Sequence, residues 1–296
     1  SIYNRPFHSA VLGQVPVRQL RPSVSAVPSN LAPGGLELDK DSRSKTDMGK
    51  HGPEFYDDDE VFATYMARRE NRVDSPNEVL EKPILDALSG DSANLRILDL
   101  GCGNAEFGRE ALKRGCRSYQ GVDGSRNMIT LAQETLNGTQ GKAVRATIAD
   151  GASPARHFAR VVSRLALPYI EAIEWVVAKV FQPLVDGGRF IFSVEHPVIT
   201  SCDRAWQSGG PRQHWIVDDY FETGRRVTHW MGRDVIKYHR TVEDYFSALR
   251  RAKFVVDDVR ESKPQPDLFA DEETYSRRKR IPLMMFFSAT RPAAPV

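Results

Sequence analysis

Cysteine and long apolar runs are both scarce in this sequence of 296 residues. The three cysteines, Cys102, Cys116 and Cys202, form no CxxC pair and leave an odd count, which favours reduced thiols over disulfides or a zinc site. No apolar run approaches the roughly 18 residues that cross a bilayer, and the N-terminal stretch lacks the compact apolar segment of a secretory signal. We therefore expect a cytoplasmic protein without membrane contact and without a bound metal ion.

A large excess of one charge is also missing. The 41 lysines and arginines nearly balance the 39 aspartates and glutamates, and the net charge of +2 is too small for the basic field that nucleic acids attract. Hydrophobic residues make up 41% of the chain and charged residues 27%, close to the proportions of ordinary soluble domains. We expect a globular protein whose partner is a small molecule rather than a nucleic acid.

The first fifty residues differ in composition from the rest. They hold five prolines and seven serines without a sustained apolar period, so we interpret residues 1–50 as a flexible or wrapping N-terminal arm. Two short apolar spots, at residues 11–12 and 15–17, could dock on the body of the protein or on a neighbouring subunit. Docking on a neighbour would make the protein a homo-oligomer, which we expect.

Helix and strand patterns begin after this arm. Acidic residues at 57–60, followed by apolar residues at helical spacing, predict an N-terminal cap helix within residues 51–74. From 75 to 292, helices and apolar strands alternate, which is typical of a parallel sheet with helices on both faces. The final two strands, separated by the charged stretch 261–280, could pair antiparallel at the sheet edge. The expected helices are 75–88, 105–113, 125–136, 170–181 and 242–252, and the expected strands are 95–100, 118–122, 143–148, 158–163, 189–194, 254–259 and 281–289.

Regular alternation stops between residues 197 and 240. This insertion contains three of the four tryptophans, Trp206, Trp215 and Trp230. It is either a small satellite core beneath a long loop or an active-site lid, because long loops in compact domains are usually functional. Both interpretations can hold together, and the three tryptophans are candidate substrate contacts.

The strongest motif is an apolar strand that runs into a glycine-rich turn and then a helix. Gly101 and Gly103 stand in this turn, where a ligand can approach the backbone because there is no Cβ. Asp123 ends the next strand, 22 residues after Gly101. An acid at that place can accept the hydroxyl protons of a ribose. The pattern therefore predicts a cofactor that contains a nucleoside.

The spacing of the glycines distinguishes between cofactors. A dinucleotide site needs a third glycine three residues after Gly103, but Glu106 occupies that position. Its carboxylate would repel a pyrophosphate, whereas it could accept from the amino group of an amino-acid tail. A sulfonium nucleoside therefore suits the turn better than NAD, which counts against a nicotinamide dehydrogenase.

Several ordered stretches carry a family resemblance. ILDLGCGNAEFG at 97–108 and GVDGS at 121–125, with further stretches at 149–151, 161–170, 184–197 and 238–249, resemble class I S-adenosylmethionine-dependent methyltransferases over residues 56 to 290. The resemblance implies an α/β Rossmann-like fold, with a seven-stranded, mostly parallel sheet that has one antiparallel edge strand. It also implies S-adenosyl-L-methionine as cofactor. The residues that it places around the cofactor are Gly101, Gly103, Asp123, Gly124, Ser125, Met128, Asp150, Gly151, Ser163 and Arg69.

Individual roles follow less firmly from the resemblance. It places the N-terminal helix over the cofactor, so Tyr65 could close the pocket and Arg69 could pair with the cofactor carboxylate, although both could simply form a helix face. Asp99 is expected to anchor the glycine loop through backbone hydrogen bonds. His196 follows a strand at the functional end of the sheet and is our candidate general base, with a hydrogen-bonded hinge as the alternative.

The expected activity is methyl transfer to a hydrophobic small molecule. The chain is similar to stand-alone methyltransferases that tailor bacterial secondary metabolites, among them the C-methyltransferases of teleocidin pathways, in which methylation of a prenyl chain triggers ring closure. A carbon acceptor of that kind needs no base before it attacks the methyl group, and tryptophan faces would stabilise the resulting cation. The alternative is a methyltransferase-fold protein that acts as a cyclase or binding partner without methyl transfer, since fold does not fix function.

Overall fold

The computed structural model describes residues 49–70, 73, 75–148, 153–202 and 214–293. The chain divides after Ser44, and all of these residues belong to the unit that begins at Lys45. Most of the predicted N-terminal arm, and three predicted site residues, Asp150, Gly151 and Trp206, lie outside the described residues.

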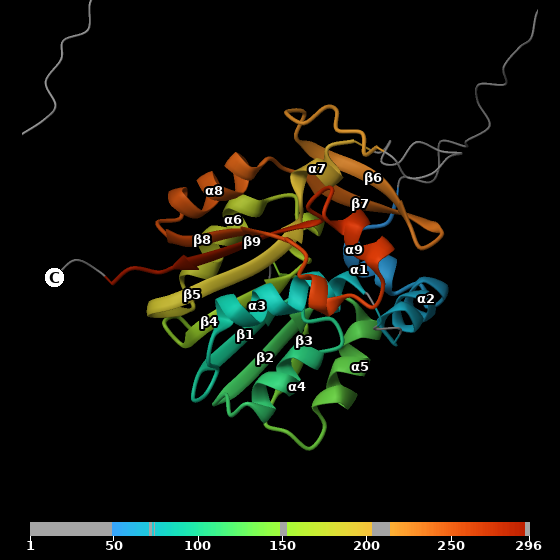
Figure 1. Cartoon of the computed structure of the whole chain (residues 1–296). Coiled ribbons are helices and arrows are strands. Elements are labelled where there is room, and N and C mark those ends of the chain that lie inside the picture. Colours follow the sequence, from blue (N-terminus) through green and yellow to red (C-terminus); the bar gives the residue numbers. More distant parts are fainter. Residues whose placement is uncertain (1–48, 71–72, 74, 149–152, 203–213, 294–296) are drawn as a thin grey trace, which may run out of the picture. The chain divides into compact units, whose positions relative to one another are not determined.

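The main sheet contains seven strands in the order β3-β2-β1-β4-β5-β9-β8 (Figure 1). The strands are β1 (Arg96–Leu100), β2 (Ser118–Asp123), β3 (Lys142–Arg145), β4 (Phe158–Arg164), β5 (Leu184–Glu195), β8 (Val255–Glu261) and β9 (Met284–Thr290). Strand β9 runs antiparallel to both of its neighbours, and the other pairs are parallel. The predicted α/β fold with one antiparallel strand is confirmed. The antiparallel strand is not the edge strand, however. Strand β8 lies outermost, and β9 lies between β8 and β5.

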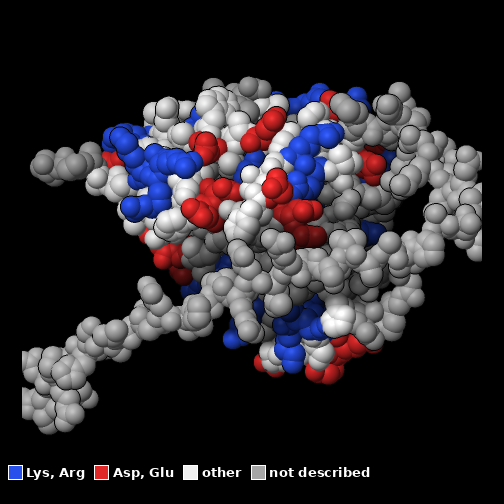
Figure 2. Space-filling model, turned by 90° about the horizontal axis from the view of Figure 1, so that it is seen from above, with Lys and Arg blue, Asp and Glu red and all other residues white. Residues whose placement is uncertain are grey.

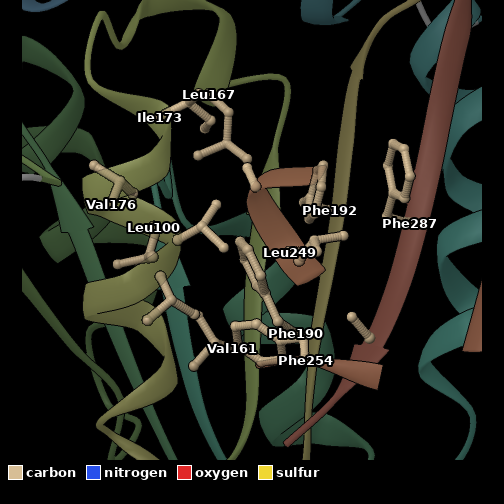
Figure 3. Close-up of a cluster of buried hydrophobic side chains, with 14 of the residues drawn as sticks. Leu100, Val161, Leu167, Ile173, Val176, Phe190, Phe192, Leu249, Phe254 and Phe287 are labelled. Atoms are coloured by element: carbon tan, nitrogen blue, oxygen red, sulfur yellow. The ribbon is translucent and has the colours of Figure 1, made fainter. Parts of the chain in front are cut away.

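Helices cover both faces of this sheet. On one face lie α6 (Ile173–Phe181) and α8 (Val242–Arg251), and on the other lie α3 (Lys82–Ser89), α4 (Glu106–Lys113) and α5 (Arg126–Leu136). Alternate residues of each strand serve the two faces, since successive side chains of a strand point in opposite directions. The first face buries the apolar cluster drawn in Figure 3, which includes Leu100, Val161, Phe190, Leu249 and Phe287. Burial on both faces explains why the central strands are almost continuously apolar in sequence.

A smaller structural unit, which we call the cap, lies beyond the main sheet. It consists of helices α1 (Gly52–Tyr56) and α2 (Asp59–Glu70) and the two-stranded sheet of β6 (Gly224–Trp230) and β7 (Arg233–His239). Phe55 of α1, Val61 of α2 and Val235 of β7 are buried together. Lys50 also pairs with β7: its N–H donates to the Asp234 carbonyl at 3.0 Å, and its carbonyl accepts from Ile236 N at 2.9 Å. The cap therefore joins the N-terminal helices to the insertion.

The hairpin of the cap was not predicted from the sequence. Its turn places Met231 at φ 52° and Gly232 at φ 80°, as a two-residue hairpin with positive φ at both central positions requires. Methionine is not a residue that signals such a turn. Further short helices are η2 (Leu167–Tyr169), α7 (Pro197–Thr200), η3 (Pro266–Leu268) and α9 (Glu272–Arg278), and α3 is preceded by a π-helical turn, η1 (Asn77–Glu81). Helices η3 and α9 lie within residues 261–280, which were expected to form only a charged connection between two strands.

Charges of both signs are interspersed on the described surface that Figure 2 shows. This distribution agrees with the small net charge. In the described part of the chain, no helix is long and apolar enough to span a bilayer.

Close packing of α4 against β2 yields a test of the fold. A Cβ at Gly108 would lie 2.2 Å from the ring of Tyr119, so Gly108→Ala must displace that ring. We expect the variant to lose about 1–3 kcal/mol of unfolding free energy through overpacking, despite a gain of about 1 kcal/mol in helix propensity. Urea denaturation measures the difference, and Arg109→Ala, at the exposed next position, should be nearly neutral. Equal stability of the two variants would contradict this packing.

Candidate functional site

The glycine turn after β1 combines a close backbone contact with an open side. Gly101 N and Cys102 N donate to the Val122 carbonyl of β2 at 2.8 and 3.0 Å. Gly101 has φ 75°, and a Cβ there would lie 2.2 Å from the Cβ of Ala166, which follows β4. Gly103 also has positive φ, at 53°, but a Cβ there would meet nothing within 4 Å. The turn is thus packed on one side and leaves space for a ligand at Gly103.

Asp123 ties this turn to the end of β2. Its Oδ2 accepts from Gly103 N at 3.0 Å, and its Oδ1 accepts from Ser125 N at 2.9 Å. Burial raises the pKa of Asp123, while the hydrogen bonds from these two N–H groups lower it. A carboxylate has about four acceptor sites, so Asp123 can accept further hydrogen bonds from a ligand.

The start of α5 lies beside Asp123 and carries the neighbouring predicted residues. Ser125 caps the helix, with its Oγ accepting from Met128 N at 3.2 Å, and both residues are buried. Gly124 leaves room for the cap, since a Cβ there would be 2.6 Å from the Cγ of Pro53. Ser163 of β4 is fully buried and donates to the Leu100 carbonyl at 2.9 Å. These four residues shape the site, and none of them presents a free reactive group.

Asp57 connects the cap to the N-terminus of α5. Its Oδ1 accepts from Ser125 Oγ at 2.8 Å and from Asn127 N at 3.1 Å. Negative charge is stabilised at a helix N-terminus, where backbone N–H groups are unpaired. The cap therefore reaches the helix that begins three residues after Asp123. From the sequence, Asp57 was expected only at the start of a helix, and this contact was not predicted.

The expected role of Asp99 was wrong. Its Oδ2 accepts from Tyr119 Oη at 2.7 Å, and among the described residues its Oδ1 has no hydrogen-bond partner. The glycine turn is held instead by Val122 and Asp123. Burial raises the pKa of Asp99 to about 6, against the lowering effects of Arg164 and of the Tyr119 hydrogen bond.

Two tyrosines of the cap meet a third that lies in η2, far from them in the sequence. The rings of Tyr65 and Tyr56 lie 5.2 Å apart in an edge-to-face arrangement, and the hydroxyls of Tyr56 and Tyr169 are 3.0 Å apart. Burial raises the pKa of Tyr65, and Asp123 is close enough to add to this increase. Tyr65 therefore lies near Asp123, whereas Tyr56 and Tyr169 were not predicted as site residues. Tyr169 follows β4, a position that could have indicated it.

The cations of α2 have protein partners. Arg69 Nη2 lies 3.2 Å from Glu106 Oε2, the acid that follows the glycine turn. The Arg68 guanidinium lies 5.3 Å from the ring centre of Trp230. Trp230 is 36% exposed and also faces the ammonium of Lys237 at 5.6 Å. This part of the cap is an aromatic and cationic surface rather than a set of free side chains.

Lys237 links the hairpin to the main sheet. Its buried ammonium donates to both carboxylate oxygens of Glu195, at 2.8 and 2.9 Å, and lies 5.5 Å from the ring centre of Tyr169. Trp215 lies elsewhere in the insertion and donates from Nε1 to the Val198 carbonyl at 2.8 Å. The insertion thus shares an apolar cluster with α1 and α2 and reaches Glu195 at the end of β5 and Tyr169 beyond the end of β4.

His196 has the hydrogen-bonded arrangement that the sequence analysis kept as its alternative. It caps α7, with Nδ1 accepting from Val198 N at 3.2 Å, and Nε2 lies 2.9 Å from Glu261 Oε1. The ring is 5% exposed. Burial lowers the pKa of His196, and the contact with Glu261 opposes that change. Because both ring nitrogens are engaged, the geometry does not favour His196 as a general base.

Comparisons with known proteins agree with this geometry. The sequence profile of a methyltransferase domain family matches residues 97–188, which span the glycine turn and Asp123. A solved structure from Mesorhizobium loti, an S-adenosylmethionine-dependent methyltransferase, is 33% identical, with a TM-score of 0.67, and the match covers 73% of this chain and 100% of that one. This chain belongs to the class I S-adenosylmethionine-dependent methyltransferase family. S-adenosylmethionine is therefore its cofactor.

Two further relatives support the methyltransferase assignment. A solved protein from Listeria monocytogenes, described as a candidate S-adenosylmethionine-dependent methyltransferase, is 35% identical, with a TM-score of 0.68, over 72% of this chain and 97% of that one. An uncharacterised Haemophilus influenzae protein is 28% identical over 249 residues, which are 80% of this chain and 96% of the relative. These matches establish the family and do not single out the teleocidin-pathway enzymes.

Replacing His196 tests its structural role in the methyltransferase. His196→Ala removes the side-chain cap of α7 and should cost about 1 kcal/mol of unfolding free energy. His196→Asn retains a residue that caps helices well and should recover part of that loss. Urea denaturation at neutral pH compares the two variants. An Ala variant as stable as the unmodified protein would show that neither hydrogen bond of the ring matters for stability.

The raised pKa of Asp99 predicts a pH-dependent stability. Since the folded state holds the proton up to about pH 6 and the unfolded state only up to 3.8, stability falls as the pH rises through this window. Asp99→Asn can still accept from Tyr119 and removes the buried charge. We expect it to stabilise the protein by about 1–3 kcal/mol at about pH 7.5 and by less at about pH 4.5. Calorimetric unfolding of both proteins gives these differences, and an equal gain at both pH values would contradict the assignment.

Proposed function

We propose that the protein transfers the methyl group of S-adenosylmethionine to a hydrophobic small molecule that binds beneath the cap. The observation that carries this proposal is the carboxylate of Asp123, held by Gly103 N and Ser125 N beside an open space at Gly103. The remaining acceptor capacity of that carboxylate fits the hydroxyl groups of a ribose. The open glycine turn fits a ligand that passes close to the backbone.

Each side chain at the carboxyl edge has a definite role in this proposal. When bound, S-adenosylmethionine supplies an electrophilic methyl group on a sulfonium sulfur. Asp123 would accept from the ribose hydroxyls, and Gly103 would leave room for the chain that continues from the ribose, while Gly101 packs against Ala166 and holds the turn in place. Asp150 and Gly151, outside the described residues, would meet the adenine. The supporting set is Gly124, Ser125, Met128 and Ser163, which hold the turn and the start of α5 in place, with Tyr65 and Arg69 above them on α2.

The cap supplies the surface for the acceptor. The rings of Tyr56, Tyr65 and Tyr169 form a continuous aromatic group between the cofactor edge and the Lys237–Glu195 ion pair. Such rings exclude water and favour an apolar acceptor, and their faces stabilise positive charge. Trp206, Trp215 and Trp230 complete the aromatic insertion as candidate substrate contacts. Holding the acceptor in line with the methyl group lowers the entropic part of the barrier.

The engagement of His196 bears on the nature of the acceptor atom. With both of its nitrogens engaged, a carbon acceptor that needs no base before it attacks the methyl group fits well, as in the methylation of a prenyl chain followed by cyclisation. The carbocation that forms then loses a proton to water, which leaves a net gain of one CH₂ group. We propose a role of this kind in secondary metabolism, in the cytoplasm. We also propose a homo-oligomer, because of the apolar spots in the first fifty residues; light scattering that finds only monomers would reject that part.

Ligand binding tests the proposal directly. S-adenosylhomocysteine at about 100 times its dissociation constant should add about 2.7 kcal/mol of stability and raise the unfolding temperature by several degrees, and NAD should not. Asp123→Ala should remove most of this shift because the ribose loses its acceptor. Asp258→Ala, on the exposed edge strand β8, is the matched control and should retain it. A shift with NAD alone would overturn the proposed function.

The mass of the product separates methyl transfer from its alternative. Incubation with S-adenosylmethionine and candidate prenylated metabolites should yield a product heavier by one CH₂ group. Product of unchanged mass would instead mean that the fold serves a cyclase.

A further inference from the structure

A small hollow lies next to the glycine turn, between α2, η1–α3 and α4. Glu106 and Phe107, the first residues of α4 after the turn, line it together with Arg69 and Arg164. The remaining lining residues are Glu78, Lys82, Leu85, Asp86 and Glu110. Its wall therefore carries cations and carboxylates side by side, which is the charge pattern that a zwitterion requires.

Two of the three cations in this wall are paired with acids of the same wall. Arg69 Nη2 lies 3.2 Å from Glu106 Oε2, and Lys82 contacts Glu110. Both are ordinary ion pairs with partly exposed carboxylates.

Arg164 is bound less completely. Its Nη2 lies 3.6 Å from Glu81 Oε2, which is beyond hydrogen-bond distance. Its Nε is buried and, among the described residues, has no hydrogen-bond partner. Glu81 accepts instead from Ser193 Oγ at 2.6 Å and from Asn77 Nδ2 at 2.8 Å. Arg164 therefore retains donors, and a buried donor without an acceptor costs free energy that a ligand could recover.

The position of Arg164 is fixed by its surroundings. It ends β4 directly after Ser163, whose hydroxyl is bonded to Leu100 at the entrance of the glycine turn. The guanidinium lies 5.7 Å from the ring centre of Phe107. Burial lowers the pKa of Arg164, and the carboxylates of Glu81 and Asp99 more than compensate, so the group stays charged.

The amino-acid end of S-adenosylmethionine has the matching chemistry. It carries a carboxylate and an ammonium group on one carbon, at the end of the chain that leaves the ribose. With the ribose at Asp123 and the chain passing Gly103, that end points toward the first residues of α4. A guanidinium binds a carboxylate through two parallel hydrogen bonds.

We propose that Arg164 binds the carboxylate of the cofactor's amino-acid tail, while the acids of the same hollow face its ammonium group. This inference rests on the proposed function and assigns one residue of the cofactor site. Arg69, which the family resemblance suggested for this carboxylate, remains with Glu106 and helps to close the hollow from α2.

Two nucleosides distinguish recognition of the tail from recognition of the ribose. S-adenosylhomocysteine carries the amino-acid tail, and 5′-methylthioadenosine has the same nucleoside without it. Titration calorimetry should show that Arg164→Gln lowers the affinity for S-adenosylhomocysteine about ten- to a hundredfold, which is the usual effect of losing a hydrogen bond to a charged group. The affinity for 5′-methylthioadenosine should change less than about twofold, because that ligand never reaches Arg164.

Three further variants serve as controls. Arg164→Lys keeps a cation beside Glu81, so this variant should fold. Its affinity for S-adenosylhomocysteine should fall less than that of Arg164→Gln, and its affinity for 5′-methylthioadenosine should again be nearly unchanged. Arg69→Gln should weaken S-adenosylhomocysteine less than Arg164→Gln does. Arg251→Gln, whose guanidinium pairs with Glu174 on the opposite face of the sheet from the hollow, should bind both ligands as the unmodified protein does.

The outcomes are distinct. The proposal is overturned if Arg164→Gln and Arg164→Lys reduce the affinity for both nucleosides equally, or reduce neither affinity. It is also overturned if they reduce the affinity for S-adenosylhomocysteine less than Arg69→Gln does. Decarboxylated S-adenosylhomocysteine provides a second measurement: it should bind the unmodified protein and Arg164→Gln alike, and a large difference would also reject the carboxylate contact. If the unmodified protein binds none of these nucleosides, the proposed function fails instead.

Discussion

The carboxylate of Asp123 is the interaction on which the rest of the site depends. Its two oxygens accept from Gly103 N and Ser125 N, so one side chain joins the glycine turn after β1 to the start of the helix after β2. Parallel pairing of β1 with β2 places both segments at the same edge of the sheet. A partly buried carboxylate is tolerated here because two backbone N–H groups donate to it. The fold therefore places this carboxylate beside the open side of the glycine turn, where we propose that a ribose binds.

The cap extends this arrangement to the acceptor side. Asp57 binds the N-terminus of α5 close to Asp123, while Lys237 binds Glu195 at the end of β5. The N-terminal helices and the hairpin, far apart in sequence, are held together by Lys50 and by a shared apolar cluster. The cap is thus one connected unit that contacts the start of α5 at one end and the last residue of β5 at the other. A methyl-transfer site needs such a cover because water must be excluded while two reactants are aligned.

Much of this could be predicted from local sequence patterns. The alternating helices and strands, the glycine turn and Asp123 depend on short-range periodicity and on one spacing, and the sheet confirms the fold. The hairpin was missed because its turn uses Met231 at positive φ, and α9 was missed because its stretch is polar. The contacts of Asp57, Tyr169 and Arg164 could not be predicted, since each joins segments that only the tertiary fold brings together. Asp99 and His196 show the converse: their residue types suggested roles, but their hydrogen-bond partners were set by packing around Tyr119 and Glu261.

The most direct measurement of the central claim is a crystal structure of the protein with S-adenosylhomocysteine. The account predicts the two ribose hydroxyls within hydrogen-bond distance of the Asp123 carboxylate, and the chain beyond the ribose passing Gly103. A nucleoside bound elsewhere, or a ribose whose hydroxyls face away from Asp123, would contradict it.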